Sequence, residues 1–226
     1  MNLIIQKEIF ERFDAPIIGV IYAEGLDNRG SSGKIDLLLR KAEEETRENF
    51  SKFKSLSEHP NIATWRKAYK KFGSDPHEYR SSVVALVRRV LKRDSVPHIN
   101  KLVDLYNYIS LKYVIPIGGE DIDAIRGDLQ LAFADGTEPF IRLNGIENEP
   151  PSAGEAVYKD EEGIICRRWN WREADRTKLT EDTKNAIIVL DALAPVDKQT
   201  VEKAANELAE LIKQFCGGMI RMEVLN

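Results

Sequence analysis

The chain has 226 residues and a formal net charge of −4; 42% of its residues are hydrophobic and 31% are charged. These values are typical of a globular protein, and they exclude a disordered chain and an indiscriminate binder of polyanions. The longest early apolar stretch, Pro16 to Ala23, is far shorter than the ~20 residues that a membrane helix needs. Two cysteines and no secretory signal pattern predict a cytoplasmic protein with neither a disulfide framework nor a membrane partner.

The first half of the chain begins with two predicted strands and continues with helices. Leu3 to Ile5 and Ile17 to Ala23 read as strands, and a turn-rich stretch ends at Gly33. Apolar residues at helical spacing then predict one helix between Ile35 and Phe53. Three further helices are predicted, with boundaries at Asn61 and Gly73, at Asp75 and Leu91, and at about Ile99 and Lys112.

The second half of the chain is dominated by strands. Leu129 to Phe133 and Phe140 to Leu143, separated by a turn, predict a hairpin. A polar loop follows, and then a turn at Asp160 to Gly163 between two strands and a buried strand at Ala186 to Leu190. The chain closes with a helix capped by Asp197 and ended by Gly217, and with a strand from Ile220 to Val224. This order predicts an α+β fold, that is, a layered mixed α/β domain, with one domain over residues 1–226.

Charge is concentrated between Asn61 and Arg93. This segment carries a net charge of +7, so the remainder of the chain carries −11. A basic helical segment on an acidic protein attracts a phosphate backbone to one face, although a solvated helix face fits the same pattern. The candidate RNA contacts are Arg66, Lys67, Lys70, Lys71, Arg88 and Arg89.

Three polar residues align on the predicted helix from Ile99 to Lys112. Asn100, Asp104 and Asn107 are spaced i, i+4 and i+7, which places them within a ~60° arc of the helix. Asparagine is a poor residue for a helix interior, so this alignment favours a polar pocket wall. A hydrogen-bond network that ties the helix to a loop is the alternative.

A second polar concentration runs from Arg167 to Lys178. It follows an apolar strand and combines arginines, two indoles and carboxylates, a set that binds nucleotides by phosphate pairing and stacking. The alternative is an internal cation–π and salt-bridge cluster. The candidate binding residues are Arg167, Trp169, Arg172, Glu173, Asp175 and Thr180, together with Glu120 earlier in the chain. The candidate catalytic residues are Asn100, Asp104, Asn107 and Asn170.

These two segments resemble the B3/B4 domain of the phenylalanyl-tRNA synthetase β subunit. The first resembles its Asn-x-x-Val-Asp-x-x-Asn-Tyr stretch, here Asn100, Val103, Asp104, Asn107 and Tyr108, and continues to Pro116 and Asp121. The second resembles its acidic, threonine-rich turn and following strand, here Thr180, Glu181, Asp182, Thr183, Asn185 and residues 186–190. Residues 61–73 and 79–82 resemble free-standing proteins built from this domain.

The resemblance implies a layered domain of the B3/B4 type that hydrolyses mischarged aminoacyl-tRNA in trans, an ester hydrolase whose partner is tRNA or aminoacyl-tRNA. One position departs from the family, because Gly118 stands where the synthetase has a histidine. Water attacks an activated ester without a protein nucleophile when hydrogen-bond donors orient it. Two alternatives stay open: a non-catalytic binder of an amino acid or small metabolite, and an RNA-binding accessory module.

Other chemistries have no supporting pattern. His59, His77 and His98 lack the spacing of a metal site, and residues 25–33 lack a phosphate-loop pattern. The sequence therefore predicts no cofactor and no metal.

Overall fold

The computed structural model describes all 226 residues and contains two β-sheets. The central sheet has the order β3-β8-β2-β9, with bounds β3 (Ile117–Asp121), β8 (Ala186–Ala192), β2 (Ile17–Glu24) and β9 (Met219–Leu225). The outer sheet has the order β1-β4-β5-β6-β7, with bounds β1 (Leu3–Ile5), β4 (Leu129–Phe133), β5 (Ala156–Lys159), β6 (Ile164–Arg167) and β7 (Arg172–Glu173). All neighbours in the central sheet are antiparallel, and β1 pairs with β4 in parallel.

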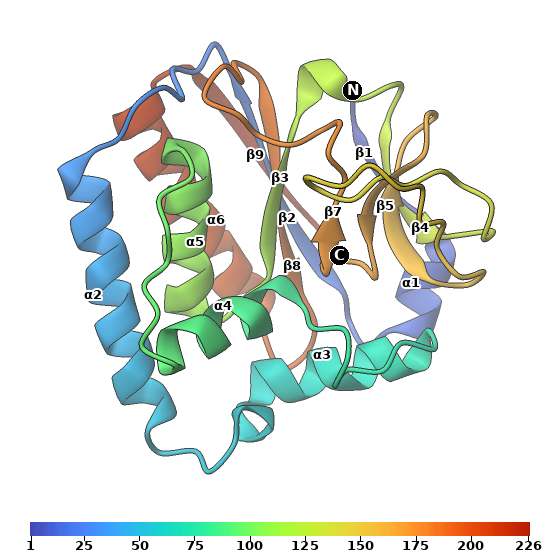
Figure 1. Cartoon of the computed structure of the whole chain (residues 1–226), viewed down its shortest axis with the longest axis horizontal. Coiled ribbons are helices and arrows are strands. Elements are labelled where there is room, and N and C mark those ends of the chain that lie inside the picture. The colour runs from blue at the N-terminus through green and yellow to red at the C-terminus, as the bar shows by residue number, and fades with distance from the viewer.

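Six α-helices complete the fold, with bounds α1 (Lys7–Arg12), α2 (Gly33–Phe50), α3 (Pro60–Lys71), α4 (Ser82–Leu91), α5 (Lys101–Tyr113) and α6 (Lys198–Cys216). Two short 3-10 helices lie at Leu56–Glu58 and Ile122–Ala124. In Figure 1, α2, α5 and α6 lie on one side of the central sheet and the outer sheet lies on the other, while α3 runs beneath both. The predicted α+β class with layered sheets is therefore confirmed. None of the helices combines the length and apolar character that crossing a membrane requires.

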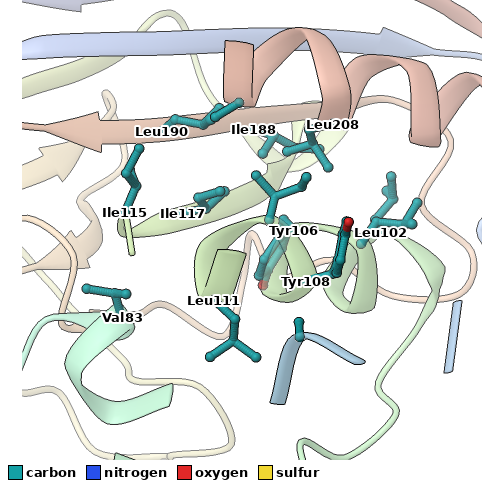
Figure 2. Close-up of a cluster of buried hydrophobic side chains, with 14 of the residues drawn as sticks. Val83, Leu102, Tyr106, Tyr108, Leu111, Ile115, Ile117, Ile188, Leu190 and Leu208 are labelled. Carbon is teal, nitrogen blue, oxygen red and sulfur yellow. The ribbon is translucent and has the colours of Figure 1, made fainter. Parts of the chain in front are cut away.

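The central sheet is buried on both faces, and alternation along its strands separates the two sides. All seven residues of β8 are buried. Ile188 and Leu190 pack among α5 and α6, whereas Ile187 and Val189 pack against the outer sheet. Figure 2 shows Ile188 and Leu190 beside Leu208 of α6. Side chains two residues apart share a face, so Asp191 lies on the same side as Val189, toward the outer sheet.

The predicted hairpin between residues 129–133 and 140–143 is wrong. β4 instead pairs with β5, with Leu131 opposite Tyr158. Residues 140–143 lie beside residues 173–175: the Leu143 amide donates to the Glu173 carbonyl at 2.9 Å, and the Asp175 amide donates to the Ile141 carbonyl at 3.0 Å. The Phe140 amide donates to Asn148 Oδ1 at 2.9 Å. Phe140 is nevertheless buried, which explains why its surroundings looked like a strand in the sequence.

Helix boundaries agree with the predictions at some caps and differ at others. Asp197 caps α6 by accepting from the Thr200 amide at 2.8 Å, as predicted. Asn61 is not a cap, because α3 begins at Pro60 and the Asn61 amide group donates to backbone carbonyls at the end of α5. Asp75 begins only a turn, and α4 starts at Ser82. The segment before β2 contains the short helix α1, which the sequence did not predict.

Gly218, in the turn between α6 and β9, should tolerate no side chain. Its φ is +78°, and a Cβ there would overlap the Glu24 carbonyl oxygen. We expect Gly218→Ala to lower the free energy of unfolding by more than about 2 kcal/mol. Gly73→Ala is the control, since φ is +82° there but a Cβ meets nothing within 4 Å, and it should cost only about 1 kcal/mol. Urea unfolding measures both values, and equal losses would show that the backbone clash has no effect.

Candidate functional site

A cavity of about 560 Å³ lies between the two sheets. Its walls come from β3 and β8 of the central sheet, from β6, β7 and the turn between them, and from α4 and α5. Apolar side chains such as Ile187, Val189 and Ile165 form much of the buried lining. The volume lies within the range of roughly 300–1,000 Å³ of small-molecule sites.

Cationic side chains surround the exposed part of the cavity. Arg88 and Arg89 end α4 on its exposed face, Lys92 follows them, and Arg172 projects from β7. Arg80, before α4, also lines the cavity, and Asp94 is the acidic residue among them. Grouped cations at a cavity mouth create a positive potential that attracts phosphate.

Three carboxyl groups line the cavity inside this rim. Glu120 follows Gly118 by two residues on β3, Asp191 follows Val189 by two residues on β8, and Glu173 lies on β7. The strand alternation therefore aims Glu120 and Asp191 at the outer sheet, where Glu173 lies. Figure 1 shows β3 and β8 in the sheet that faces β7.

Burial raises the pKa of all three carboxyl groups. Burial and the charge of Glu173 hold the pKa of Glu120 well above its usual range. Burial raises the pKa of Glu173 to about 7, against the lowering effects of the Gly119 amide and the Arg172 charge. Burial raises the pKa of Asp191 to about 6, although hydrogen bonds oppose the shift. An acidic interior that is partly protonated near neutral pH thus lies inside a cationic rim.

Asp191 is held by a buried hydrogen-bond network. It accepts from the Tyr158 hydroxyl at 2.6 Å and from Asn170 Nδ2 at 3.1 Å. The Tyr69 hydroxyl donates to Asn170 Oδ1 at 3.1 Å, so both ends of the Asn170 side chain are fixed. Such a connected network gives this wall of the cavity a defined shape.

The turn between β6 and β7 places the aromatic and basic residues. Arg168 and Trp169 have φ values of +49° and +68°, a left-handed conformation that non-glycine residues adopt at a cost. The fully buried Trp169 packs against Phe13 and Trp65 with ring centroids 4.9 and 5.2 Å away. This anchor sends the following Trp171 and Arg172 back to the cavity.

Gly118 leaves space directly beside a carboxyl group. A Cβ at this position would lie 3.2 Å from Glu173 Oε1, tighter than ordinary contact. Glu120 adds a second feature, because its Oε2 is buried without a hydrogen-bond partner. Unpaired buried oxygens are costly, and the buried Thr177 hydroxyl, which lowers the pKa of Glu120 as a hydrogen-bond donor, is the internal group that can satisfy this carboxyl group.

The structure brings together most, but not all, of the predicted site residues. Those that line the cavity are Asn107, Asn170, Glu120, Trp169, Arg172, Glu173, Arg88 and Arg89. Asn100 instead caps α5 by accepting from the Val103 amide at 3.1 Å, and it donates to the Leu179 carbonyl at 3.2 Å. Asp104 accepts from the Ile99 amide and pairs with His98. The predicted alignment of three residues therefore breaks, since only Asn107 faces the cavity.

Three predicted binding residues have their polar groups engaged within the fold. Arg167 donates to Glu155 through Nε and Nη2 at 3.0 and 2.9 Å, and both residues are buried. Asp175 accepts from the Asn144 amide and from Lys178. The Thr180 hydroxyl accepts from the Asp182 amide in a local turn. None of the three lines the cavity, so we assign them supporting contacts.

The basic residues between Asn61 and Arg93 lie at two separate places on the structure. Arg66, Lys67 and Lys70 of α3 line a separate shallow hollow of about 190 Å³, whereas Arg88 and Arg89 of α4 line the main cavity. Lys71 donates to the Arg12 carbonyl at 3.1 Å. The α3 cations thus form a second basic surface apart from the cavity.

The cavity residues that were absent from the predicted set include Asp191, Tyr158, Arg80 and Lys92. A signal existed for Asp191, because it is the charged residue in the otherwise apolar run of β8. A charge within a buried strand is rare unless it has partners or a function.

Comparison with known proteins places the chain in a family. The model of the B3/4 domain family matches residues 64–217, which include every residue that lines the cavity. The chain is 23% identical to the phenylalanine–tRNA ligase β subunit of Photorhabdus laumondii over 155 residues, which cover 58% of this chain and 19% of that subunit. It is 26% identical to the β subunit of Fusobacterium nucleatum over 110 residues, which cover 49% of this chain and 13% of that subunit.

A solved structure shows the same fold. The chain matches an N-terminal fragment of the phenylalanyl-tRNA synthetase β subunit from Pyrococcus horikoshii with a TM-score of 0.50 and 15% identity, over 97% of this chain and 50% of the fragment. The matched segments span about a fifth or less of the full-length curated relatives. On the match of the family model, the chain belongs to the B3/4 domain family.

Proposed function

We propose that the cavity binds the aminoacyl end of a tRNA and hydrolyses the ester bond of mischarged aminoacyl-tRNA in trans. One observation carries this proposal: carboxyl groups lie inside the cavity and cations surround its mouth. An aminoacyl-tRNA end has the matching charges, since the amino acid carries an ammonium group and the nucleotides carry phosphates. The relation to β subunits of phenylalanine–tRNA ligases supports the same class of ligand.

The residues around the cavity have complementary roles in this proposal. Arg88, Arg89 and Arg172 bind the phosphates, and Trp171 offers an indole face for stacking with the terminal adenine. Asn107 donates and accepts hydrogen bonds that orient the ester carbonyl and a water molecule. Asn170, which already bonds to Tyr69 and Asp191, has one further N–H for the carbonyl oxygen. The water oxygen attacks the carbonyl carbon, the bond to the ribose oxygen breaks, and the ribose oxygen regains a proton.

The basic surface of α3 extends the contact with RNA. Arg66, Lys67 and Lys70 are accessible there, and Lys71 adjoins them. Each phosphate that a protein cation neutralises releases counterions, so the affinity for tRNA should fall steeply as salt concentration rises.

One observation favours a second function, which is binding of a free amino acid or small metabolite without hydrolysis. Gly118 presents no side chain to the cavity at the position where the similar synthetase domain has a histidine. A cavity that retains its acidic interior without that group would still hold an ammonium ligand.

A panel of mischarged tRNAs tests the proposal. The wild-type protein should release the amino acid from at least one of them, and Asn107→Ala should slow this release by about 100-fold, as expected for loss of one orienting hydrogen-bonding group. Asn206→Ala is the matched control, because this asparagine bonds to Glu202 on the exposed side of α6 and should leave the rate unchanged. If every tRNA stays charged while a free amino acid binds, the second function replaces the first.

A further inference from the structure

We propose that Glu173 is the catalytic base of this deacylation and that it acts on a water molecule in the space left open by Gly118. The inference rests on the proposed function, because it names the group that accepts the proton of the attacking water. With Glu173 as the reacting group, this chain needs no histidine at position 118.

The geometry places the Glu173 carboxyl group at the right position. Its Oε1 lies 3.2 Å from the point where a Cβ of residue 118 would stand. No other atom outside residues 117–119 lies within 4 Å of that point, and Gly118 and Glu173 both line the cavity. A water molecule in this space would be within hydrogen-bond reach of the carboxylate, as a general base requires.

Glu120 completes a pair of carboxyl groups. It is 5% exposed and lines the same cavity, and its Oε2 has no hydrogen-bond partner. Glu120 is buried and Glu173 is half-buried, and neighbouring carboxyl groups that are shielded from water do not ionise together readily, so one of them retains a proton. Burial and the charge of Glu173 raise the pKa of Glu120 well above its usual range, so Glu120 keeps the proton near neutral pH. Glu173 has a pKa of about 7 and is then partly ionised, which suits a base that works at neutral pH.

The other titratable groups around Glu173 do not compete for this role. Tyr106 of α5 and Cys166 of β6 stay neutral, because burial raises the pKa of each well above its usual value. Asp191 of β8 already accepts hydrogen bonds through both carboxyl oxygens. The cations that face the pair are Arg172, which lowers the pKa of Glu173, Arg176, which lowers that of Glu120, and the rim residues Arg80, Arg88, Arg89 and Lys92.

The proposed step balances with water as the only added reactant. The water oxygen forms a bond to the ester carbonyl carbon while its proton moves to the Glu173 carboxylate. The bond between the carbonyl carbon and the ribose oxygen then breaks, and the protonated Glu173 returns the proton to that oxygen. The products are the free amino acid and the tRNA, and Glu173 regains its ionised form.

Steady-state kinetics of Glu173→Gln between pH 5.5 and 8.5 test the inference, on the tRNA that the wild-type protein deacylates. We expect kcat to fall about 100-fold with KM within twofold, since general bases contribute about 10²–10⁴ in rate. The wild-type kcat should rise with pH through about 7, and Glu173→Gln should lose this dependence. Glu147→Gln, an exposed change outside the cavity, is the control and should match the wild type.

Gly118→Ala provides a second variant that keeps the carboxyl group. Its methyl group would crowd Glu173 Oε1, so kcat should fall about tenfold while the Kd for tRNA stays unchanged. A higher KM with normal kcat in Glu173→Gln would overturn the inference and make Glu173 a ligand of the ammonium group. Wild-type rates in Glu173→Gln would overturn it as well but leave the proposed function standing, whereas a wild-type protein without activity would refute both.

Discussion

Replacing Glu155 with alanine should lower the free energy of unfolding by about 3–5 kcal/mol, because it leaves a buried cation without its partner. Glu155 is 1% exposed and accepts four hydrogen bonds, from Nε and Nη2 of Arg167 and from the Arg168 and Ser152 amides, at 2.9 to 3.3 Å. Arg167 is itself only 7% exposed, so water cannot replace the lost carboxylate. This ion pair supports the strained turn that carries Trp169 and Arg172.

Urea unfolding of Glu155→Ala gives this value, and an exposed ion pair supplies the control. Glu45 pairs with Lys41 at 3.7 Å with both side chains largely in water, so Glu45→Ala should change stability by less than about 0.5 kcal/mol. If Glu155→Ala lowered the free energy of unfolding no more than Glu45→Ala does, the buried ion pair would not hold the turn. Loss of the cavity's function in Glu155→Ala would then need another cause.

Stability should fall as the pH rises from about 4 to 8, which is the second large effect. The folded-state pKa values of Asp191 and Glu173, about 6 and about 7, lie above the ordinary values of 3.8 and 4.5 for these groups. The folded state therefore holds more protons than the unfolded state between about pH 4 and pH 7. The resulting stability is fully present below the unfolded pKa values and is lost as the pH rises through the folded ones. Each group accounts for roughly 3 kcal/mol of this loss, since one pKa unit corresponds to about 1.4 kcal/mol.

Substitution of the two carboxyl groups tests this origin of the pH dependence. Glu173→Gln and Asp191→Asn each remove one titrating group, so each should flatten the curve of unfolding free energy against pH. Their double variant should keep only the pH dependence that Glu120 contributes, so its slope should be well below that of the wild type. Chemical unfolding at several pH values measures the slope, and an unchanged slope in the double variant would contradict the assignment of the raised pKa values to these residues.

Several elements could be predicted from the sequence because local pattern and tertiary environment agree in them. The apolar run at Ile17 to Ala23 forms β2, and the run at Ala186 to Leu190 forms β8. The closing helix was also marked by its own capping residue, Asp197. The hairpin failed because pairing depends on a partner strand: residues 140–143 have the apolar pattern of a strand, but β5, farther along the chain, occupies the place beside β4.

The candidate site could be predicted where its residues lie close together in the sequence. It could not be predicted where tertiary packing determines which side chains reach the cavity. The tryptophan-arginine segment led to Trp169, Arg172 and Glu173, which do line the cavity. The prediction that Asn100 shares a helix face with Asp104 and Asn107 was wrong, because Asn100 is the cap that precedes the first turn of α5. Asp191 carried a signal as the charged residue of an apolar strand, but its contact with Tyr158 depends on tertiary packing that the sequence does not display.

The central claim is that an aminoacyl group lies in the cavity between β3 and β7. A crystal structure with a 3′-aminoacylamino-3′-deoxyadenosine, in which an amide replaces the scissile ester, tests it most directly. We expect the aminoacyl group beside Gly118 and Glu173, with the adenosine toward Arg172 and α4. The ligand bound at another surface, or an unoccupied cavity at saturating ligand, would contradict it.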